Sequence, residues 1–166
     1  MDNFSLLTLC IVLLGLILTS ACFSSSETAM MALNKYRLKH LAEKQHRGAR
    51  RAQKLLERPD RLIGLILLGN NFVNILAAQI VTVITLYSFG DSSLIISSII
   101  LTAVILVFAE VVPKTLAALH PERIAFPSSA VLSILMIPLY PLVWSLNKVS
   151  NGILLLFGVD SENQAP

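Results

Sequence analysis

The sequence predicts an all-α integral membrane protein with three transmembrane helices and further helices at the membrane surface. Of its 166 residues, 55% are hydrophobic and only 14% are charged, whereas about 25% are charged in an average soluble domain. Its uncharged stretches are long enough to cross a bilayer, and one segment between them is strongly basic. These observations exclude an ordinary soluble domain, a disordered chain and a disulfide scaffold.

The first uncharged run covers residues 3–26 and predicts a span over about 3–30, because about 20 apolar residues cross a ~30 Å hydrocarbon core. A cleaved signal peptide is the rival interpretation. It fits poorly, since no Lys or Arg precedes the run and the run exceeds the usual 7–15 apolar residues.

Two further uncharged runs predict spans over about 62–89 and 92–113. The connection between them is so short that the two spans are expected to form an antiparallel hairpin. Between the first and second spans, residues 35–61 contain ten of the thirteen Lys and Arg. The positive-inside rule places this basic segment in the cytoplasm, as one or two amphipathic helices on the membrane surface, and a nucleic-acid partner is not expected.

Within the region 115–158, the stretch from residue 124 onward is apolar but interrupted by Pro127, Pro138, Pro141 and Lys148. Together with the amphipathic Trp144, this pattern favours a juxtamembrane belt of broken helices at the inner interface. A fourth span is the alternative. With a belt, the N-terminus lies outside and the C-terminus in the cytoplasm. Residues 1–159 then form a transmembrane domain, and 160–166 begin a linker to a cytoplasmic domain.

Candidate functional residues are polar groups inside apolar helices, because an unpaired polar group costs free energy there. Ser20, Ser24 and Glu27 follow i, i+4, i+7 spacing and share one face of the first span. Two structural roles compete with a binding role. The serines can bond back to the carbonyl four residues earlier, or Ser24 and Glu27 can form a capping box that restarts a helix.

A second cluster lies in the second span, roughly 12–18 Å from its cytoplasmic start. It contains Asn70, Asn71 and Asn74, preceded by Gly69. Asn70 and Asn74 share a helical face and predict a polar cavity. The alternative is hydrogen bonding between helices, with Gly69 allowing close packing.

The third cluster ends the third span with Glu110, Pro113 and Lys114. Pro113 cannot donate to the carbonyl of Ala109, so a helix break and a free backbone oxygen are expected beside Glu110. That arrangement is typical of an ion site. The alternative is an i, i+4 ion pair between Glu110 and Lys114 near the interface.

The predicted topology places all three clusters in the inner half of the bilayer. Hydroxyl, amide, carbonyl and carboxylate oxygens suit hard cations such as Mg²⁺, Ca²⁺ or Na⁺ rather than zinc or copper. The three histidines lie in loops and do not compete. No His or Lys lies in an apolar run to act as a base for Ser24, so an enzyme is not expected.

The three motifs, in this order, resemble the transmembrane domain of the CorB/CorC and cyclin M (CNNM) magnesium transporter family. They read Phe23-Ser24-Ser25-Ser26-Glu27-Thr28-Ala29, Gly69-Asn70-Asn71-Phe72-Val73-Asn74-Ile75 and Glu110-Val111-Val112-Pro113-Lys114. The resemblance implies homodimers of three-span domains with a juxtamembrane belt, followed by a cytoplasmic CBS-domain pair. It implies these metal ligands: Ser20, Ser24, Gly69 through its carbonyl, Asn70, Asn74 and Glu110, supported by Asn71, Pro113 and Lys114.

The expected function is therefore Mg²⁺ transport across the cell (inner) membrane, as export by alternating access to a partly dehydrated cation. Moving a divalent cation outward against an inside-negative potential costs about 4.6 kcal/mol per 100 mV. A driving ion is needed, and Na⁺ entry is the candidate. The alternative is a membrane-anchored Mg²⁺ sensor without transport. Membrane lipid, a second copy and the CBS pair are the expected partners.

Overall fold

The computed structural model describes residues 2–160, and the elements of that part of the chain are helices joined by short connections. Its α-helices are α1 (Asn3–Ala32), α2 (Lys35–Glu43), α3 (Arg47–Leu56), α4 (Pro59–Ser88), α5 (Leu94–Val104), α6 (Val112–Leu119) and α7 (Pro121–Leu156). A 3₁₀ turn, Asp91–Ser93, precedes α5, and a π-helical turn, Ile105–Val111, joins α5 to α6. The predicted linker beyond Asp160 lies outside the described residues.

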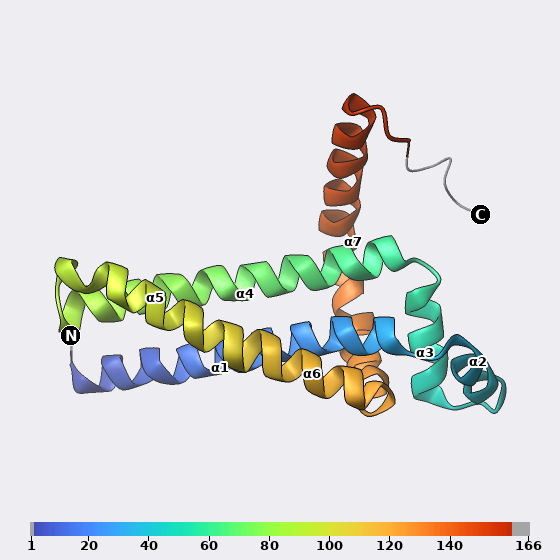
Figure 1. Ribbon diagram of the computed structural model, residues 1–166, viewed down its shortest axis with the longest axis horizontal. Helices are drawn as coiled ribbons and strands as arrows, with labels where there is room; N and C mark the ends of the chain where they lie inside the picture. The colour runs from blue at the N-terminus through green and yellow to red at the C-terminus, as the bar shows by residue number, and fades with distance from the viewer. Residues whose placement is uncertain (1, 161–166) are drawn as a thin grey trace.

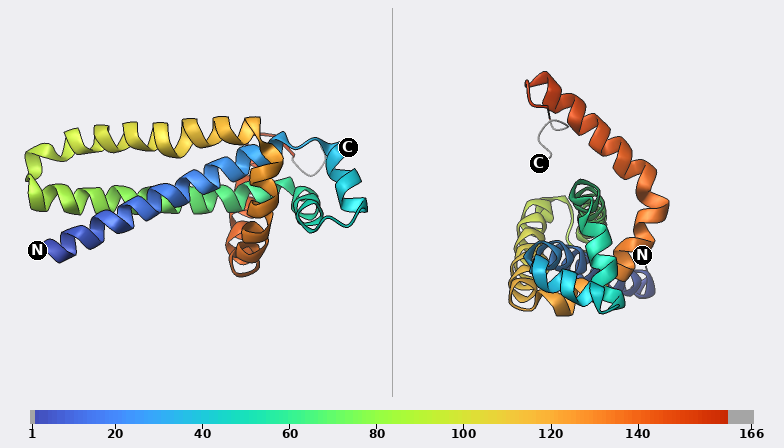
Figure 2. Two further views of the ribbon diagram at one scale, coloured as in Figure 1. Left: turned by 90° about the horizontal axis from the view of Figure 1, so that it is seen from below. Right: turned by 90° about the vertical axis from the view of Figure 1, so that its right-hand side faces the viewer.

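Long helices run side by side along the long axis of the molecule (Figures 1 and 2). They are α1, α4 and the continuous rod from α5 to α6. The N-terminus and the α4–α5 hairpin lie at one end, and α2 and α3 lie at the other. The short hairpin predicted between the second and third uncharged runs is therefore present.

Four helical segments within the described residues are long and apolar enough to cross a membrane. They are Asn3–Ala32, Pro59–Ser88, Asp91–Leu119 and Pro121–Leu156. The first three cover the predicted spans, and the third continues past residue 113. Length and hydropathy thus give one more candidate span than the sequence analysis predicts.

The expectation of broken helices after residue 115 is wrong for residues 121–156, because α7 is one helix with Pro127, Pro138 and Pro141 inside it. A proline removes only its own N–H bond, and its fixed φ is already helical, so a helix can bend rather than end. Figure 2 shows α7 curving, and Figure 1 shows it crossing the long helices instead of running beside them.

Two other expected helix interruptions are absent. Helix α1 runs through Ser24, so the capping-box alternative for Ser24 and Glu27 is wrong. The break expected at Pro113 is replaced by the π-helical turn, in which the N–H of Val112 bonds to the carbonyl of Val107. Pro113 then stands in the first turn of α6, where a missing N–H costs little.

Local signals explain the ends of the short basic helices. The Asn34 side chain accepts hydrogen bonds from the N–H groups of Tyr36 and Arg37 and caps α2. His46 Nδ1 accepts from the N–H of Ala49, 3.1 Å away, and caps α3. Pro59 begins α4, and Gly90 ends the hairpin with φ +81°, a conformation that favours glycine.

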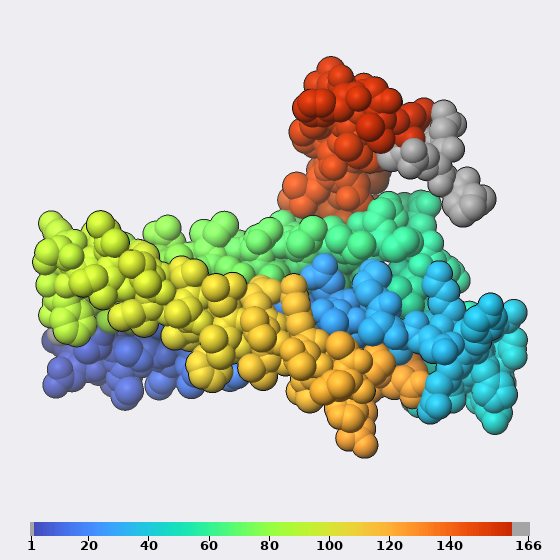
Figure 3. Space-filling view, viewed as in Figure 1, coloured from blue at the N-terminus to red at the C-terminus, as the bar shows by residue number. Residues whose placement is uncertain are grey.

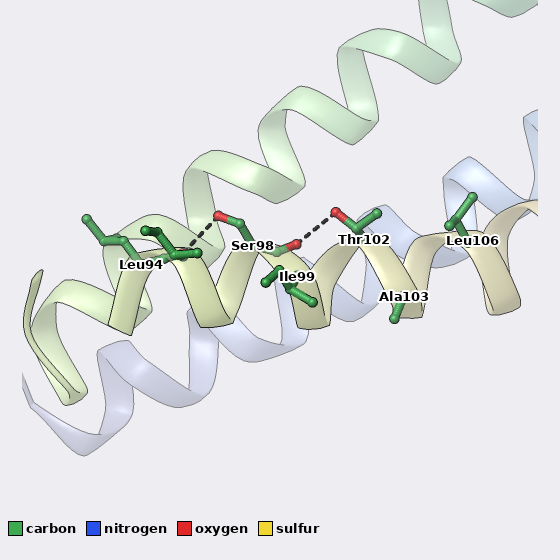
Figure 4. Close-up of a pocket in the computed structure, with 7 residues that line it drawn as sticks. Leu94, Ser98, Ile99, Thr102, Ala103 and Leu106 are labelled. Carbon is green, nitrogen blue, oxygen red and sulfur yellow. Dashed lines mark hydrogen bonds between the residues drawn. The ribbon is translucent and has the colours of Figure 1, made fainter. Parts of the chain in front are cut away.

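Small residues let the helices approach closely. The alanines at positions 29, 49, 52, 77, 109, 117 and 125 are fully buried. The outer surface is apolar, and α5 contains no buried residue. On its outer groove, Ser98 and Thr102 bond to the carbonyls of Leu94 and Ser98 (Figure 4). An apolar outside with its hydroxyls satisfied internally fits contact with lipid.

Candidate metal site

The packing of the long helices brings together residues that lie 40 to 86 positions apart in the sequence. Helix α1 contributes Ser20 and Ser24, and α4 contributes Asn70 and Asn74. The π-helical turn contributes Glu110. Each predicted cluster therefore supplies at least one residue to a single polar site between three helices.

Ser20 lies at one end of this site and is fully buried. Its Oγ is 2.9 Å from Oδ1 of Asn70 and 2.6 Å from Oδ1 of Asn74. A hydroxyl has one proton, so it cannot donate a full hydrogen bond to both amide oxygens. Three oxygens thus converge with too few protons between them, an arrangement that a bound cation would stabilise.

Glu110 is held from three directions at the other end. Ser24 Oγ donates to Oε2 at 3.1 Å, and Asn70 Nδ2 donates to Oε1 at 3.4 Å. Lys114 Nζ lies 3.1 Å from the same Oε2. Asn70 therefore connects the two ends, with its oxygen towards Ser20 and its nitrogen towards Glu110.

The ion pair between Glu110 and Lys114 was the structural alternative for this motif, and it is formed. The Lys114 side chain is 46% exposed and that of Glu110 is 24% exposed. Pairs exposed to this degree contribute only about 0–1 kcal/mol. Lys114 can therefore yield its place beside Oε2 to a cation at small cost, and the ion pair does not exclude a binding role.

Asn71 and Gly69 do not supply side chains to the site. Asn71 is exposed, and the side-chain hydrogen bonds described above do not involve it. A Cβ built on Gly69 would lie 2.5 to 3.0 Å from three ring atoms of Phe23. Gly69 therefore makes room for the Phe23 ring between α1 and α4. Pro113 also supplies no ligand and is buried in the first turn of α6.

The remaining polar residues of the first cluster lie apart from the site. Ser25 and Ser26 bond back to the carbonyl of Cys22, at 3.0 and 2.6 Å, which is the structural role considered for serines here. Glu27 is half-buried and has no hydrogen-bonding or ionic partner within residues 2–160. Glu27 follows Ser20 and Ser24 at helical spacing but takes no part in the hydrogen bonds of the site.

Sequence reasoning assigned no packing role to the side chains of two residues that shape the site. Phe23 packs against Gly69, and Ala109 is fully buried immediately before Glu110. Neither has a distinctive sequence signal, because apolar residues are expected throughout these helices. Within the described residues there is no cluster of three His, Cys, Asp or Glu residues. The donors of this site are instead hydroxyls, amides and one carboxylate.

The arrangement of these motifs matches a known family over most of the chain. A family model described as "Cyclin M transmembrane N-terminal domain" matches residues 11–166. The chain belongs to the cyclin M (CNNM) family. Its apolar helices and its relatives identify it as a multi-pass inner membrane protein.

Several curated relatives are similar to this chain. The inner membrane protein YfjD of Escherichia coli is 50% identical over 86% of the chain and 33% of its own length. A UPF0053 protein of Haemophilus influenzae is 45% identical over 99% of the chain and 39% of its length. The polyamine export protein of Salmonella typhimurium is 30% identical over 89% of the chain and 36% of its length. The chain thus spans between a third and two-fifths of these relatives.

Proposed function

We propose that this cyclin M domain exports Mg²⁺ by alternating access at the site between α1, α4 and the π-helical turn. The observation that carries the proposal is the convergence of the Ser20, Asn70 and Asn74 oxygens beside Glu110. Membrane transport fits the family and the names of two relatives, which are called polyamine export proteins. The choice of Mg²⁺ rests on the donor chemistry.

The oxygen spacing favours a small cation. Adjacent ligands of an octahedral Mg²⁺ at 2.0–2.1 Å are about 2.9 Å apart, whereas Ca²⁺ at 2.3–2.6 Å needs wider spacing. Ser20 Oγ is 2.6 and 2.9 Å from the two amide oxygens. A single carboxylate among neutral donors binds Mg²⁺ weakly enough for release, and water completes the coordination.

The proposed topology places α1, α4 and Asp91–Leu119 across the membrane, with the N-terminus outside. Two features support it. The basic helices α2 and α3 lie together at one end of the long helices, as the positive-inside rule requires of a cytoplasmic end. Helix α7 crosses the other helices near that end, which favours an interfacial position and a cytoplasmic C-terminus.

Lys114 provides a way for the empty site to return to its starting conformation after the ion is released. In the absence of a cation, its ammonium group compensates Glu110. A cation that reaches the carboxylate displaces Lys114, so Glu110 faces a positive charge in both states, and with Mg²⁺ bound the site carries one net positive charge. Because export of Mg²⁺ works against the membrane potential, coupling to Na⁺ entry remains part of the proposal. A homodimer and a cytoplasmic CBS-domain pair remain predictions from the family resemblance.

Mg²⁺ flux in proteoliposomes tests the proposal. Asn70→Ala is compared with Asn71→Ala, which removes the same amide from an exposed neighbour. Ser20→Ala is compared with Ser26→Ala, a buried serine that bonds to its own helix. Loss of one ligand costs about 1–3 kcal/mol, so we expect about a 5- to 100-fold loss of Mg²⁺ affinity in the site variants. The two control variants should retain flux.

Three outcomes are decisive. Equal losses in the site and control variants would contradict the site, because the effect would then be structural. Mg²⁺ binding without flux in the wild-type chain would favour the sensor over the transporter. Dependence of flux on an imposed Na⁺ gradient would support exchange, and flux independent of that gradient would contradict it.

Polyamine export is a second candidate, because proteins of Haemophilus influenzae and Salmonella typhimurium that resemble this chain bear that name. Amide oxygens and a carboxylate also accept hydrogen bonds from ammonium groups. Spermidine flux in the same proteoliposomes separates the candidates. If spermidine is transported and Mg²⁺ only inhibits that transport, spermidine and not Mg²⁺ is the exported cation.

A further inference from the structure

A cavity of about 670 Å³ lies where α3, the beginning of α4 and the middle of α7 meet. Figure 1 shows α7 crossing α4 near its first turns, and the space-filling view in Figure 3 shows the end of α7 projecting from the body of the molecule. The cavity is separate from the candidate metal site, because the two have no residue in common.

One wall of this cavity is positively charged. Lys54, Arg58 and Arg61 line it together with a single carboxylate, Glu57, which leaves an excess of two positive charges. The ion pairs found in residues 2–160 join Arg37 to Glu122 and Lys114 to Glu110. Among residues 2–160, no carboxylate therefore forms an ion pair, within 4.0 Å, with these three cations.

The opposite wall is apolar and comes from α7. It includes Met136, Ile137 and Tyr140, and the Ile137 side chain is 79% exposed. The Arg61 guanidinium lies over the Tyr140 ring, 4.9 Å from its centre. This stacking orients Arg61 along the wall while leaving its N–H groups able to bind an anion.

The cavity lies at the level where lipid headgroups are expected. Arg58 precedes the first residue of α4, whose 30 residues are long and apolar enough to span a membrane. The cationic wall thus stands at the end of a membrane helix, beside apolar surface on α7. A ligand that fills both walls combines an anionic group with a hydrocarbon chain.

We propose that this cavity binds an anionic phospholipid. Its phosphate lies among Lys54, Arg58 and Arg61, and its acyl chains follow Met136 and Ile137. Free phosphate would satisfy only the cationic wall and leave the apolar wall without a partner. The bound lipid would connect the beginning of α4 to α7. This inference does not depend on which ion is transported.

Trp144 provides the assay, because it is the single tryptophan of the chain and follows Tyr140 by one helical turn. The protein is reconstituted in phosphatidylcholine bilayers containing phosphatidylglycerol with brominated acyl chains, which quench nearby tryptophan. A second set of bilayers has the bromine on phosphatidylcholine instead. Comparing the quenching in the two sets gives the binding constant of phosphatidylglycerol relative to phosphatidylcholine. We expect stronger quenching by the anionic lipid, and about a fivefold change in that constant for each cation removed.

The test variant is Lys54→Gln with Arg58→Gln, which spares the contact between Arg61 and Tyr140. The matched control is Lys39→Gln with Lys44→Gln, which removes the same charge from exposed positions on α2 and at its C-terminal cap. Lys148→Gln is a second control, because its Nζ lies 4.7 Å from the centre of the Trp144 ring and could itself attract anionic lipid. Circular dichroism verifies the helical content of each variant.

A preference for the anionic lipid that falls only in the Lys54 and Arg58 variant supports the proposal. An unchanged preference in that variant overturns it, as does an equal loss in either control. Addition of inorganic phosphate distinguishes the source of the anion. Displacement of the lipid by millimolar phosphate would show a phosphate site rather than a lipid site. If the double variant loses helical content, Arg58→Gln alone gives the same comparison.

Discussion

Single residues in the site differ in role even when they are neighbours in the sequence. Asn70 and Asn74 are four residues apart and face Ser20, whereas Asn71 is rotated by about 100° from Asn70 and is exposed. Helical spacing therefore predicted which asparagines could act together. It did not predict the position of Glu27, because the partner of a helix face depends on where the neighbouring helices pass.

The packing of α1 against α4 at Gly69 leaves no space for one additional methyl group. Gly69→Ala should destabilise the packing of α1 on α4 by about 1–3 kcal/mol, because the new Cβ would lie 2.5 Å from the Phe23 ring. Gly15→Ala is the matched control, since no atom lies within 4 Å of its Cβ position and alanine favours a helix by about 1 kcal/mol. Thermal unfolding in detergent measures both variants.

A second substitution shows whether the Phe23 ring is the cause. Gly69→Ala combined with Phe23→Leu should recover part of the lost thermal stability, because the smaller side chain leaves space for the methyl group. If the double variant is as unstable as the sum of the two single variants, the contact between Gly69 and Phe23 is not what limits packing.

At the scale of a helix, the π-helical turn places Glu110. A π turn holds one more residue per turn than an α-helix, so it changes the direction of the side chains on either side of it. The sequence analysis predicted an irregularity from Pro113 but expected a break. The distinction depends on how α1 packs against the turn that contains the buried Ala109, and a local sequence pattern does not contain that information.

Pro113→Ala tests this connection between helix geometry and the site. With an N–H restored at position 113, regular α-helical bonding becomes available and Glu110 is no longer held towards Ser24. Loss of a hydrogen bond to a charged group costs about 1.5–3 kcal/mol, so Mg²⁺ affinity should fall by about tenfold or more. Equilibrium Mg²⁺ binding provides the measurement.

Pro138→Ala is the matched control, because it removes a proline from the interior of α7, away from the site. It should leave Mg²⁺ affinity unchanged. If both proline variants bind Mg²⁺ like the wild-type chain, the π-helical turn does not depend on Pro113, and the role assigned to that proline fails.

At the scale of the whole molecule, uncharged runs were sufficient to predict the long helices α1 and α4 and the short hairpin after α4. They were not sufficient for α7. Its direction is set by buried contacts of residues such as Ser129, Leu132 and Val143 with the other helices. Hydropathy measures how apolar a helix is and says nothing about its angle to its neighbours, so four segments satisfy the criterion for a span.

Cysteine accessibility decides between three spans and four. In a chain with Cys10 and Cys22 replaced by alanine, single cysteines are introduced as Ser92→Cys, Glu43→Cys and Val159→Cys, all at exposed positions. If α7 lies along the inner interface, a membrane-impermeant maleimide should label intact cells only at position 92. All three positions should react after permeabilisation, which verifies that each thiol is accessible.

Position 159, beyond α7, distinguishes three spans from four. The basic segment and the hairpin lie on the same sides of the membrane in both topologies. Labelling of position 159 in intact cells would make α7 a fourth span and place the C-terminus outside. The cationic cavity would then keep its place at the inner end of α4, but α7 would pass through the bilayer rather than along it. Labelling of position 43 would reverse the whole topology and contradict the positive-inside argument.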